Sequence, residues 1–266
     1  MADESLDLPF KLALGASRAV RGLTVVTTGD RPARVEGGRM SLRVFIGWDS
    51  REAECADVLA YSLREHSSVP LDIRYLKLSE LPFQRDRESL QSTEFTYSRF
   101  LVPYLCGYQG KAIFMDCDML CLGDIKELDD LDMSPYALRV VKHDYRPAAT
   151  TKMDGRAQTV YPRKNWSSLM LMNCARLQLW TREVVESESG AFLHRFQGID
   201  DDLIGDIPDT WNTLDWMDER TKLIHYTSGG PWFEECKDHP YGQIWLQWRD
   251  RYRAAGGSVP RAAWSA

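Results

Sequence analysis

Two carboxylates end an apolar segment in the stretch KAIFMDCDMLCLGDI, residues 111–125. Asp116 and Asp118 follow AIFM, which is typical of a buried strand, and burying an unpaired carboxylate costs several kcal/mol. Residues two apart in an extended chain point to one side, about 6–7 Å apart. Two oxygen donors without a basic neighbour in sequence suit Mn²⁺ or Mg²⁺, which keeps positions open for phosphates. Alternatively, one aspartate caps the next turn and the other pairs with an arginine from elsewhere.

The Asp-x-Asp spacing alone is a weak signal, because Asp130 and Asp132, and Asp200 and Asp202, repeat it. A third candidate ligand is His225 in KLIHYTSGGPWF, which ends an apolar strand. Neutral imidazole is a common ligand of Mn²⁺. The glycine pair that follows lets the backbone approach a ligand and offer N–H groups to an anion. The alternative is a histidine that is hydrogen-bonded for structural reasons only.

The segments that must position these residues alternate between strand and helix patterns. Apolar runs predict strands at 42–49, 71–78, 111–116 and 136–141, with helices at 50–67 and 92–105 between the first three. Ser50 is the candidate N-cap of the first helix. This order predicts an α/β fold around a largely parallel sheet, in which ligands bind at the carboxyl edge.

The second half of the chain is less regular. We predict strands at 167–174 and 221–226, and helices at 174–188 and 240–255. The last helix combines tryptophan and tyrosine with several arginines, including Arg249, Arg251 and Arg253. This composition fits peripheral contact with the inner face of a membrane, or equally an aromatic face that packs on the domain.

Composition narrows the class of protein. The 266 residues carry a net charge of −6 and scattered basic residues, so nucleic acid is not expected as a partner. The six cysteines form no CxxC pair, which favours reduced thiols in the cytoplasm. No signal peptide or apolar run of about 18 residues is evident. We expect an N-terminal extension over 1–40, with Met40 as an alternative start, a main domain over 41–240, and a C-terminal segment over 241–266.

These motifs together resemble glycosyltransferase family 8, from about Leu42 to Trp232. Their order is that of the family: VFIGWDSREAECADVLAYSL, TYSRFLVPYL, IFMDCDMLCLGDIKEL, NWSSLMLMN, IDDDLIGDIPDTWN and IHYTSGGPW. The resemblance implies a single GT-A domain with a mixed, mostly parallel sheet. It also implies transfer of a hexose from a nucleotide sugar, most often a UDP-hexose, to a glycan, glycolipid or other hydroxyl acceptor, with retention.

The resemblance assigns roles residue by residue. The metal ligands would be Asp116, Asp118 and His225. The donor would be bound by Ile46, Gly47, Trp48, Asp49, Arg99, Asp116, Cys117, Gly229, Gly230 and Trp232. Catalytic roles would fall to Asp200, Asp201 and Arg99, and the acceptor side to Asn165, Ser167 and Ser168.

The chain departs from the family pattern in several places. Gly230 stands where the family usually has a lysine, Trp166-Ser167-Ser168 replaces Asn-Ser-Gly, and Asp201 replaces a glutamine. Phosphate stabilisation would then come from the amides of Gly229 and Gly230, from Lys237, or from a basic residue in YPRKNW. These departures also suggest an alternative function, a non-catalytic GT-A protein that binds a nucleotide sugar or glycan as a regulatory or scaffold subunit.

Overall fold

The computed structural model describes residues 35–36, 39–88, 91–144 and 162–257. Most of the predicted N-terminal extension, and the last residues of the chain, therefore lie outside the described residues. Within 1–40, the strands β1 (Val35–Glu36) and β2 (Arg39–Met40) pair in antiparallel fashion.

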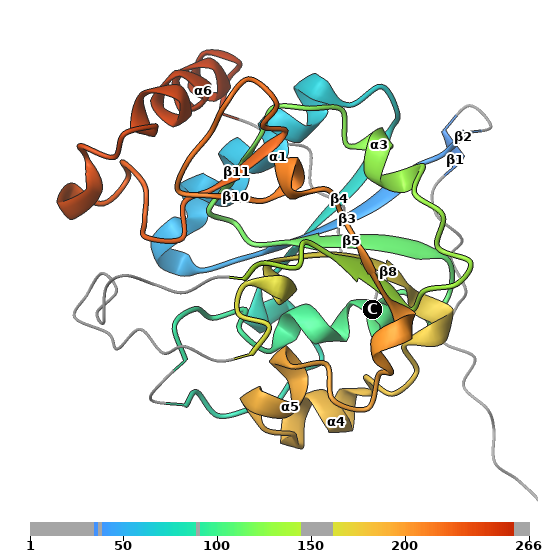
Figure 1. Cartoon of the computed structure of the whole chain (residues 1–266). Helices are drawn as coiled ribbons and strands as arrows, with labels where there is room; N and C mark the ends of the chain where they lie inside the picture. Colours follow the sequence, from blue (N-terminus) through green and yellow to red (C-terminus); the bar gives the residue numbers. More distant parts are fainter. Residues whose placement is uncertain (1–34, 37–38, 89–90, 145–161, 258–266) are drawn as a thin grey trace, which may run out of the picture. The chain divides into compact units, whose positions relative to one another are not determined.

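A six-stranded sheet of mixed direction forms the centre of the described chain (Figure 1). Its strands run in the order β4 (Leu71–Leu76), β3 (Leu42–Gly47), β5 (Lys111–Met115), β8 (Leu169–Asn173), β7 (Leu138–Val140) and β9 (Ile204–Asp206). Only the pairs of β8 with β5 and with β7 are antiparallel. The predicted α/β fold with a mixed, mostly parallel sheet is confirmed.

A second sheet of three strands carries the histidine. It consists of β10 (Thr213–Leu214), β11 (Leu223–His225) and β6 (Met119–Cys121). Since β6 starts one residue after Asp118 and pairs with β11 in antiparallel register, Met119 stands opposite His225. The ladder continues outward, because the Tyr226 amide donates to the Asp118 carbonyl at 2.9 Å. Two segments a hundred residues apart are thereby held side by side.

Helices cover the central sheet on both faces (Figure 1). One face carries α1 (Ala53–His66) and α6 (Gly242–Ala254), and the other carries α4 (Arg182–Ser187) and α5 (Gly190–His194). The other α-helices among the described residues are single turns, α2 (Val102–Leu105) and α3 (Lys126–Asp129). The spacing of the alanines and leucines in 50–67 predicts an apolar face of Ala53, Ala56, Leu59, Ala60 and Leu63. The last four are fully buried, whereas Ala53 is partly exposed.

The aromatic side of α6 is used inside the molecule. Trp245, Trp248 and Tyr252 are buried in one cluster with Val58 of α1 and Ile224 of β11. Of the two interpretations made from the sequence, this packing matches the one in which the aromatic face of the last helix packs on the domain. No helix in the part of the chain that the structure describes combines the length and apolar character needed to cross a bilayer.

Two predicted helices are wrong in extent. Over 92–105, only a 3₁₀ turn at Ser98–Leu101 and α2 form. Pro103 has no backbone N–H, so it cannot donate to the carbonyl four residues earlier as a helical residue would. At the start of the segment, the Thr96 hydroxyl donates to the Thr93 carbonyl at 2.8 Å, which favours a local turn over a helix.

Over 174–188, the chain forms a 3₁₀ turn at Cys174–Arg176 and then a separate α4. The Thr181 hydroxyl starts α4 by accepting from the Val184 amide at 3.2 Å. Ser50 is likewise not the N-cap expected for the first helix, since the Asp49 side chain caps the 3₁₀ turn Ser50–Glu52 that precedes α1.

Candidate active site

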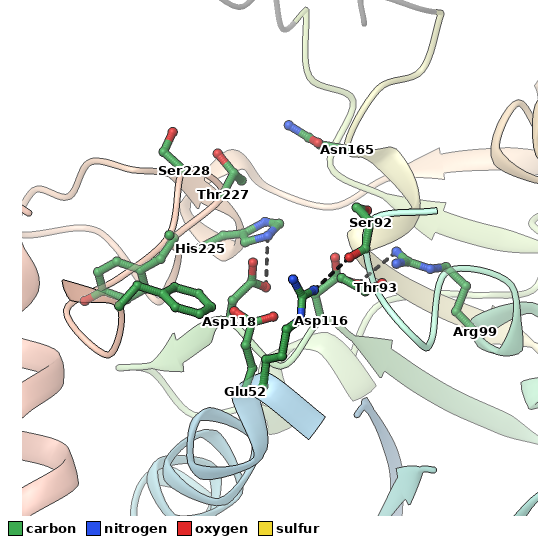
Figure 2. A pocket seen from close by; sticks show the side chains of 14 residues that line it. Glu52, Ser92, Thr93, Arg99, Asp116, Asp118, Asn165, His225, Thr227 and Ser228 are labelled. Atoms are coloured by element: carbon green, nitrogen blue, oxygen red, sulfur yellow. Dashed lines mark hydrogen bonds and ion pairs between the residues drawn. The ribbon is translucent and has the colours of Figure 1, made fainter. Parts of the chain in front are cut away.

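A pocket of about 130 Å³ opens where β5 and β11 end and β6 begins (Figure 2). Six of the predicted site residues line it, namely Arg99, Asp116, Asp118, Asn165, His225 and Gly229. Residues that sequence reasoning did not assign complete the lining: Arg51, Glu52, Ser92, Thr93, Tyr226, Thr227, Ser228 and Phe233.

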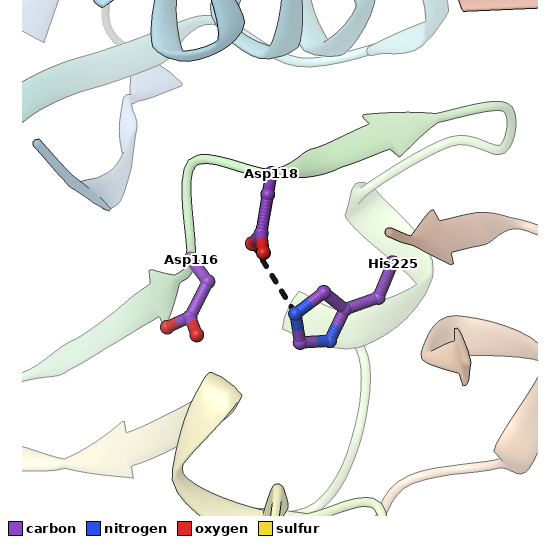
Figure 3. A group of neighbouring side chains, drawn as sticks. All are labelled: Asp116, Asp118 and His225. Carbon is purple, nitrogen blue, oxygen red and sulfur yellow. Dashed lines mark ion pairs between the residues drawn. The ribbon is translucent and has the colours of Figure 1, made fainter. Parts of the chain in front are cut away.

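Asp116, Asp118 and His225 form one compact group (Figure 3). Each offers a ligand atom, and these atoms all lie within 4.8 Å of one another. The His225 Nε2 and the Asp118 Oδ1 are 3.2 Å apart. The sheet edge that the sequence predicted is therefore the place where the three candidate ligands meet.

A hydrogen-bond chain determines which nitrogen of His225 carries the proton. The Ser168 hydroxyl donates to the Asn165 carbonyl at 2.7 Å and accepts from the Asn212 amide at 2.9 Å. The Asn212 Oδ1 must then accept from the His225 Nδ1, 3.0 Å away. In the neutral ring, the Nε2 lone pair consequently faces Asp118.

The contact between Nε2 and Asp118 has no proton to share while His225 is neutral. Asp118 Oδ1 is buried and has no hydrogen-bond donor among the described residues. Burial opposes the charged form of His225, but the charge and hydrogen bond of Asp118, together with the charges of Asp116 and Asp215, outweigh it and raise the histidine pKa. Either a proton on His225 or a cation between the groups resolves the contact, and the donor set of two carboxylates and one imidazole fits a divalent cation.

Arg99 reaches Asp116 from the turn before α2. Its Nη1 donates to Asp116 Oδ1 at 2.8 Å and to the Ser167 carbonyl at 2.9 Å, and its Nε donates to the Thr96 carbonyl. Arg99 is buried, not a surface residue as the alternative had it. The alternative in which an arginine pairs with one of the two aspartates is therefore met by Arg99 and Asp116. Asp116 nevertheless also lines the pocket.

Glu52 lies on the floor of the pocket beside Asp118 (Figure 2). Burial, followed by the negative charge of Asp118, raises the pKa of Glu52 to about 8. The sequence signal for a role of Glu52 was its position three residues after Asp49, close to the carboxyl end of the first strand. The direction of its side chain depends on the 3₁₀ turn, which the sequence analysis did not predict.

The loop after β11 is shaped by its two glycines. Gly229 has φ +96°, and its amide donates to the Tyr226 carbonyl at 2.8 Å, so this N–H already has a partner. A Cβ on Gly230 would lie 2.0 Å from the Trp232 ring, which shows that the indole occupies the space beside this backbone. Trp232 packs on Tyr226 and Trp245.

Asp215 holds the same loop from behind. Its carboxylate accepts from the Thr227 hydroxyl at 2.6 Å, and from the Ser228 amide and hydroxyl at 3.1 and 2.8 Å. Burial acts to raise the pKa of Asp215, but hydrogen bonds from His239, Thr227 and Ser228 outweigh it and hold the pKa below its usual value.

Residues 46–49, which the family resemblance implies as the binding site for the base of the donor, lie outside the lining of the pocket. Ile46 is in the core, and Gly47 leaves room for the Phe95 ring, which a Cβ would approach to 2.4 Å. Asp49 is buried and accepts from the amides of Arg51 and Glu94. Half-buried Trp48 has the Lys77 ammonium 4.7 Å from its ring centroid. A base-binding role for these residues remains a prediction.

The other predicted residues are also placed outside the lining. Asp200 and Asp201 are exposed, and Asp201 forms an ion pair with Arg163. Cys117 is buried, as are Ser167 and Ser168, whose hydroxyls bond to His194 and to Asn212. Lys237 is exposed and pairs with Glu234. All six cysteines are free thiols.

Known proteins resemble this chain in sequence and in fold. Residues 56–197 match the family model of glycosyl transferase family 8. Protein CDI of Arabidopsis thaliana is 46% identical over 224 residues, which cover 79% of this chain and 86% of that protein.

Among solved structures, the galactosyltransferase LgtC in complex with donor and acceptor sugar analogues has a TM-score of 0.55 at 14% identity, covering 82% of this chain and 98% of its own. Apo GlyE of Streptococcus pneumoniae TIGR4 has a TM-score of 0.54 at 15% identity, covering 84% of this chain. This chain spans 66% of the length of GlyE. These likenesses and the mixed sheet define a GT-A glycosyltransferase fold. The chain belongs to glycosyl transferase family 8.

Proposed function

We propose that this protein is a metal-dependent, retaining glycosyltransferase that moves a hexose from a UDP-sugar to a hydroxyl group of a glycan, glycolipid or other acceptor. The observation that carries the proposal is the group of Asp116, Asp118 and His225 at the sheet edge, with a bare imidazole nitrogen facing a carboxylate oxygen that has no donor among the described residues. Such a donor set would hold Mn²⁺ or Mg²⁺. The bound cation supplies positive charge to the leaving diphosphate.

Arg99 is the candidate for binding the phosphate or sugar of the donor, and it also bonds to Asp116. Its Nε and Nη1 bond to Thr96, Asp116 and Ser167, whereas no described residue accepts from Nη2. Since Arg99 lines the pocket, this remaining nitrogen can donate to a phosphate or sugar oxygen. We propose that Arg99 contributes to charge stabilisation in this way.

Asn165 is the candidate for the acceptor side. It lines the pocket in a left-handed backbone conformation, φ 64°, and its buried Nδ2 has no acceptor among the described residues. An unsatisfied amide costs about 1–3 kcal/mol, and a hydroxyl oxygen of the acceptor or of the transferred sugar would relieve that cost. The roles of Ser167 and Ser168 are then to support Arg99 and Asn212.

Retention requires either a carboxylate nucleophile or attack on the face that the diphosphate leaves. Asp200 and Asp201 are exposed and do not line the pocket, so we favour the second course. The acceptor oxygen forms a bond to the anomeric carbon as the bond to the phosphate oxygen breaks, and the hydroxyl proton passes to that phosphate. A glycosyl-enzyme trapped at Asp200 would overturn this choice.

The test is UDP release from a panel of UDP-hexoses with and without Mn²⁺, for the wild type and Asp118→Asn. Asp130→Asn is the matched control, because Asp130 belongs to a second Asp-x-Asp pair and forms an exposed ion pair with Lys126. We expect Mn²⁺-dependent release that falls at least about 100-fold in Asp118→Asn and is unchanged in Asp130→Asn. Release that ignores both Mn²⁺ and Asp118 would contradict the proposal.

A second candidate function is that of a GT-A protein that binds a nucleotide sugar without turnover. The observation that favours it is the exposure of Asp200 and Asp201, the predicted catalytic carboxylates. Binding of UDP-sugars by calorimetry, with no release in the presence of any acceptor tried, would favour that function.

A further inference from the structure

Glu52 is a buried acid that the proposed chemistry does not use. It ends the 3₁₀ turn Ser50–Glu52, which the Asp49 carboxylate caps by accepting from the Arg51 amide. This turn directs the glutamate side chain under the pocket instead of along α1. Only 8% of the residue is exposed, although it is charged in its ordinary state. A side chain placed there at such a desolvation cost needs partners.

The partners within the protein are few and neutral. The Trp232 indole donates from Nε1 to Glu52 Oε1 at 3.2 Å. The Cys117 thiol is 4.0 Å from Oε2, which makes at most a weak contact. No lysine or arginine of the described residues lies within ion-pair distance of Glu52, in contrast to Asp116, which has Arg99. A carboxyl group has room for about four hydrogen bonds, so most of its capacity is unfilled.

A metal ion does not account for Glu52. The ligand atoms of Asp116, Asp118 and His225 lie within 4.8 Å of one another, and Glu52 is not part of that group. Most of the hydrogen-bond donors that a nucleotide sugar carries are hydroxyl groups. Tyr226 and Phe233 also line this pocket, and pockets for small polar molecules combine apolar walls with a few placed polar groups.

We propose that Glu52 binds a vicinal pair of hydroxyl groups of the nucleotide sugar, from either the ribose or the transferred hexose, and so determines which donors the enzyme accepts. This inference rests on the proposed function. A site built to bond hydroxyl groups rejects analogues that lack them, because its own buried polar group is then left without a partner.

The test pairs a protein change with a ligand change. Glu52→Gln keeps an acceptor for the Trp232 indole and removes the second carboxylate oxygen. Glu54→Gln is the matched control, because Glu54 lies in the first turn of α1, pairs with Arg253 and does not line the pocket. Calorimetry with Mn²⁺ measures binding of UDP, 2′-deoxy-UDP and 3′-deoxy-UDP in one arm, and of UDP-glucose and its 2-deoxy and 3-deoxy analogues in the other.

For the wild type and Glu54→Gln, we expect removal of the recognised hydroxyl to weaken binding about 10- to 100-fold. In Glu52→Gln the same removal should change binding less than about 3-fold, since the interaction is already lost. The arm that shows this coupling identifies the ribose or the hexose as its source.

Equal losses of affinity in the wild type and Glu52→Gln would overturn the inference. So would a wild type that binds every deoxy ligand as tightly as the parent ligand, and this second result holds even if Glu52→Gln folds poorly. Weaker binding of Mn²⁺ alone to Glu52→Gln would make Glu52 a metal ligand and would also overturn it. If neither UDP nor UDP-glucose binds the wild type, the proposed UDP donor fails first, and this result is distinct from the others.

Discussion

At the scale of single residues, Asn212 is the side chain on which the chemistry of His225 depends. Its amide oxygen accepts from Nδ1, and this bond leaves Nε2 free to act as a ligand. Asn212 lies in one of the motifs that resemble the family, but its role could not be predicted, because its contact with His225 depends on the pairing of β10 with β11. By contrast, the three metal-ligand candidates could be predicted, since their types and their positions at strand ends are local properties of the sequence.

We predict that Asn212→Ala weakens Mn²⁺ binding about 10- to 100-fold, because the imidazole loses its orienting partner. Asn212→Asp should retain more of the affinity, because its carboxylate still accepts from Nδ1. Titration calorimetry with Mn²⁺ measures both variants. An unchanged dissociation constant in Asn212→Ala would show that the bond to Asn212 does not position the ligand.

At the scale of elements, the loop after β11 carries part of the pocket wall and is held by Asp215. Asp215 has φ +59°, a conformation that aspartate and asparagine adopt more readily than alanine does. We predict that Asp215→Ala weakens UDP binding at least about 10-fold, since it frees Thr227 and Ser228 and strains the backbone. Asp215→Asn should lose less, because its side-chain oxygen still accepts. Equal affinities in the two variants, by calorimetry with Mn²⁺, would contradict this account.

The packing of α6 on α1 makes a prediction about stability. Trp245 is fully buried and its ring centroid is 4.9 Å from that of Trp232. Trp245→Ala should lower the free energy of unfolding by about 3–5 kcal/mol. Trp245→Phe should cost less, since it keeps ring packing and removes an indole N–H that has no acceptor among the described residues. Urea unfolding measures both, and a loss below about 1 kcal/mol in Trp245→Ala would mean that α6 packs only loosely.

Elements differ in how well the sequence predicts them. The pattern of α6 is regular over thirteen residues, and its predicted extent is close to the observed one. The helices expected at 92–105 and 174–188 failed because their apolar residues repeat with helical spacing while Pro103, Thr96 and Thr181 end or restart the hydrogen bonding. Such breaks depend on single side-chain bonds that periodicity does not contain.

At the scale of the whole molecule, the acid sensitivity of folding can be predicted from a buried histidine. Burial, with the positive charges of Arg99 and Arg85, lowers the pKa of His194 from its ordinary 6.5 to about 3. Between these values the unfolded chain binds a proton that the folded chain does not, so His194 makes stability fall as the pH falls. The loss attributable to this residue is about 1.4 kcal/mol per pH unit.

Urea unfolding at pH 7, 6 and 5 checks this prediction when the wild type is compared with His194→Gln. Glu52 acts in the opposite direction between pH 4.5 and about 8, but it is common to both proteins and cancels in the difference. As the pH falls, the free energy of unfolding should decrease more steeply in the wild type than in His194→Gln. The difference in slope should correspond to the uptake of about one proton on unfolding. Parallel slopes would mean that His194 is protonated in the folded protein.

The topology was predictable only in part. Alternating strand and helix patterns indicate the parallel pairs of β3 with β4 and β5. They do not indicate the reversed strand β8 or the three-stranded sheet that carries His225, because strand direction and partner choice are settled by tertiary packing. Glu52 reaches the pocket through a 3₁₀ turn that was not predicted, and Asn212 stands one residue before β10 of the three-stranded sheet. Asp116, by contrast, directly follows the predicted strand β5.

The central claim is that Asp116, Asp118 and His225 together hold a divalent cation for a nucleotide sugar. An anomalous difference map at the manganese edge, from crystals of the full chain soaked with Mn²⁺ and UDP, tests it most directly. The account predicts a single strong peak within coordination distance, about 2.0–2.3 Å, of all three side chains and of the diphosphate. A map with bound UDP and no peak between these residues, or with the ion held elsewhere, would contradict it.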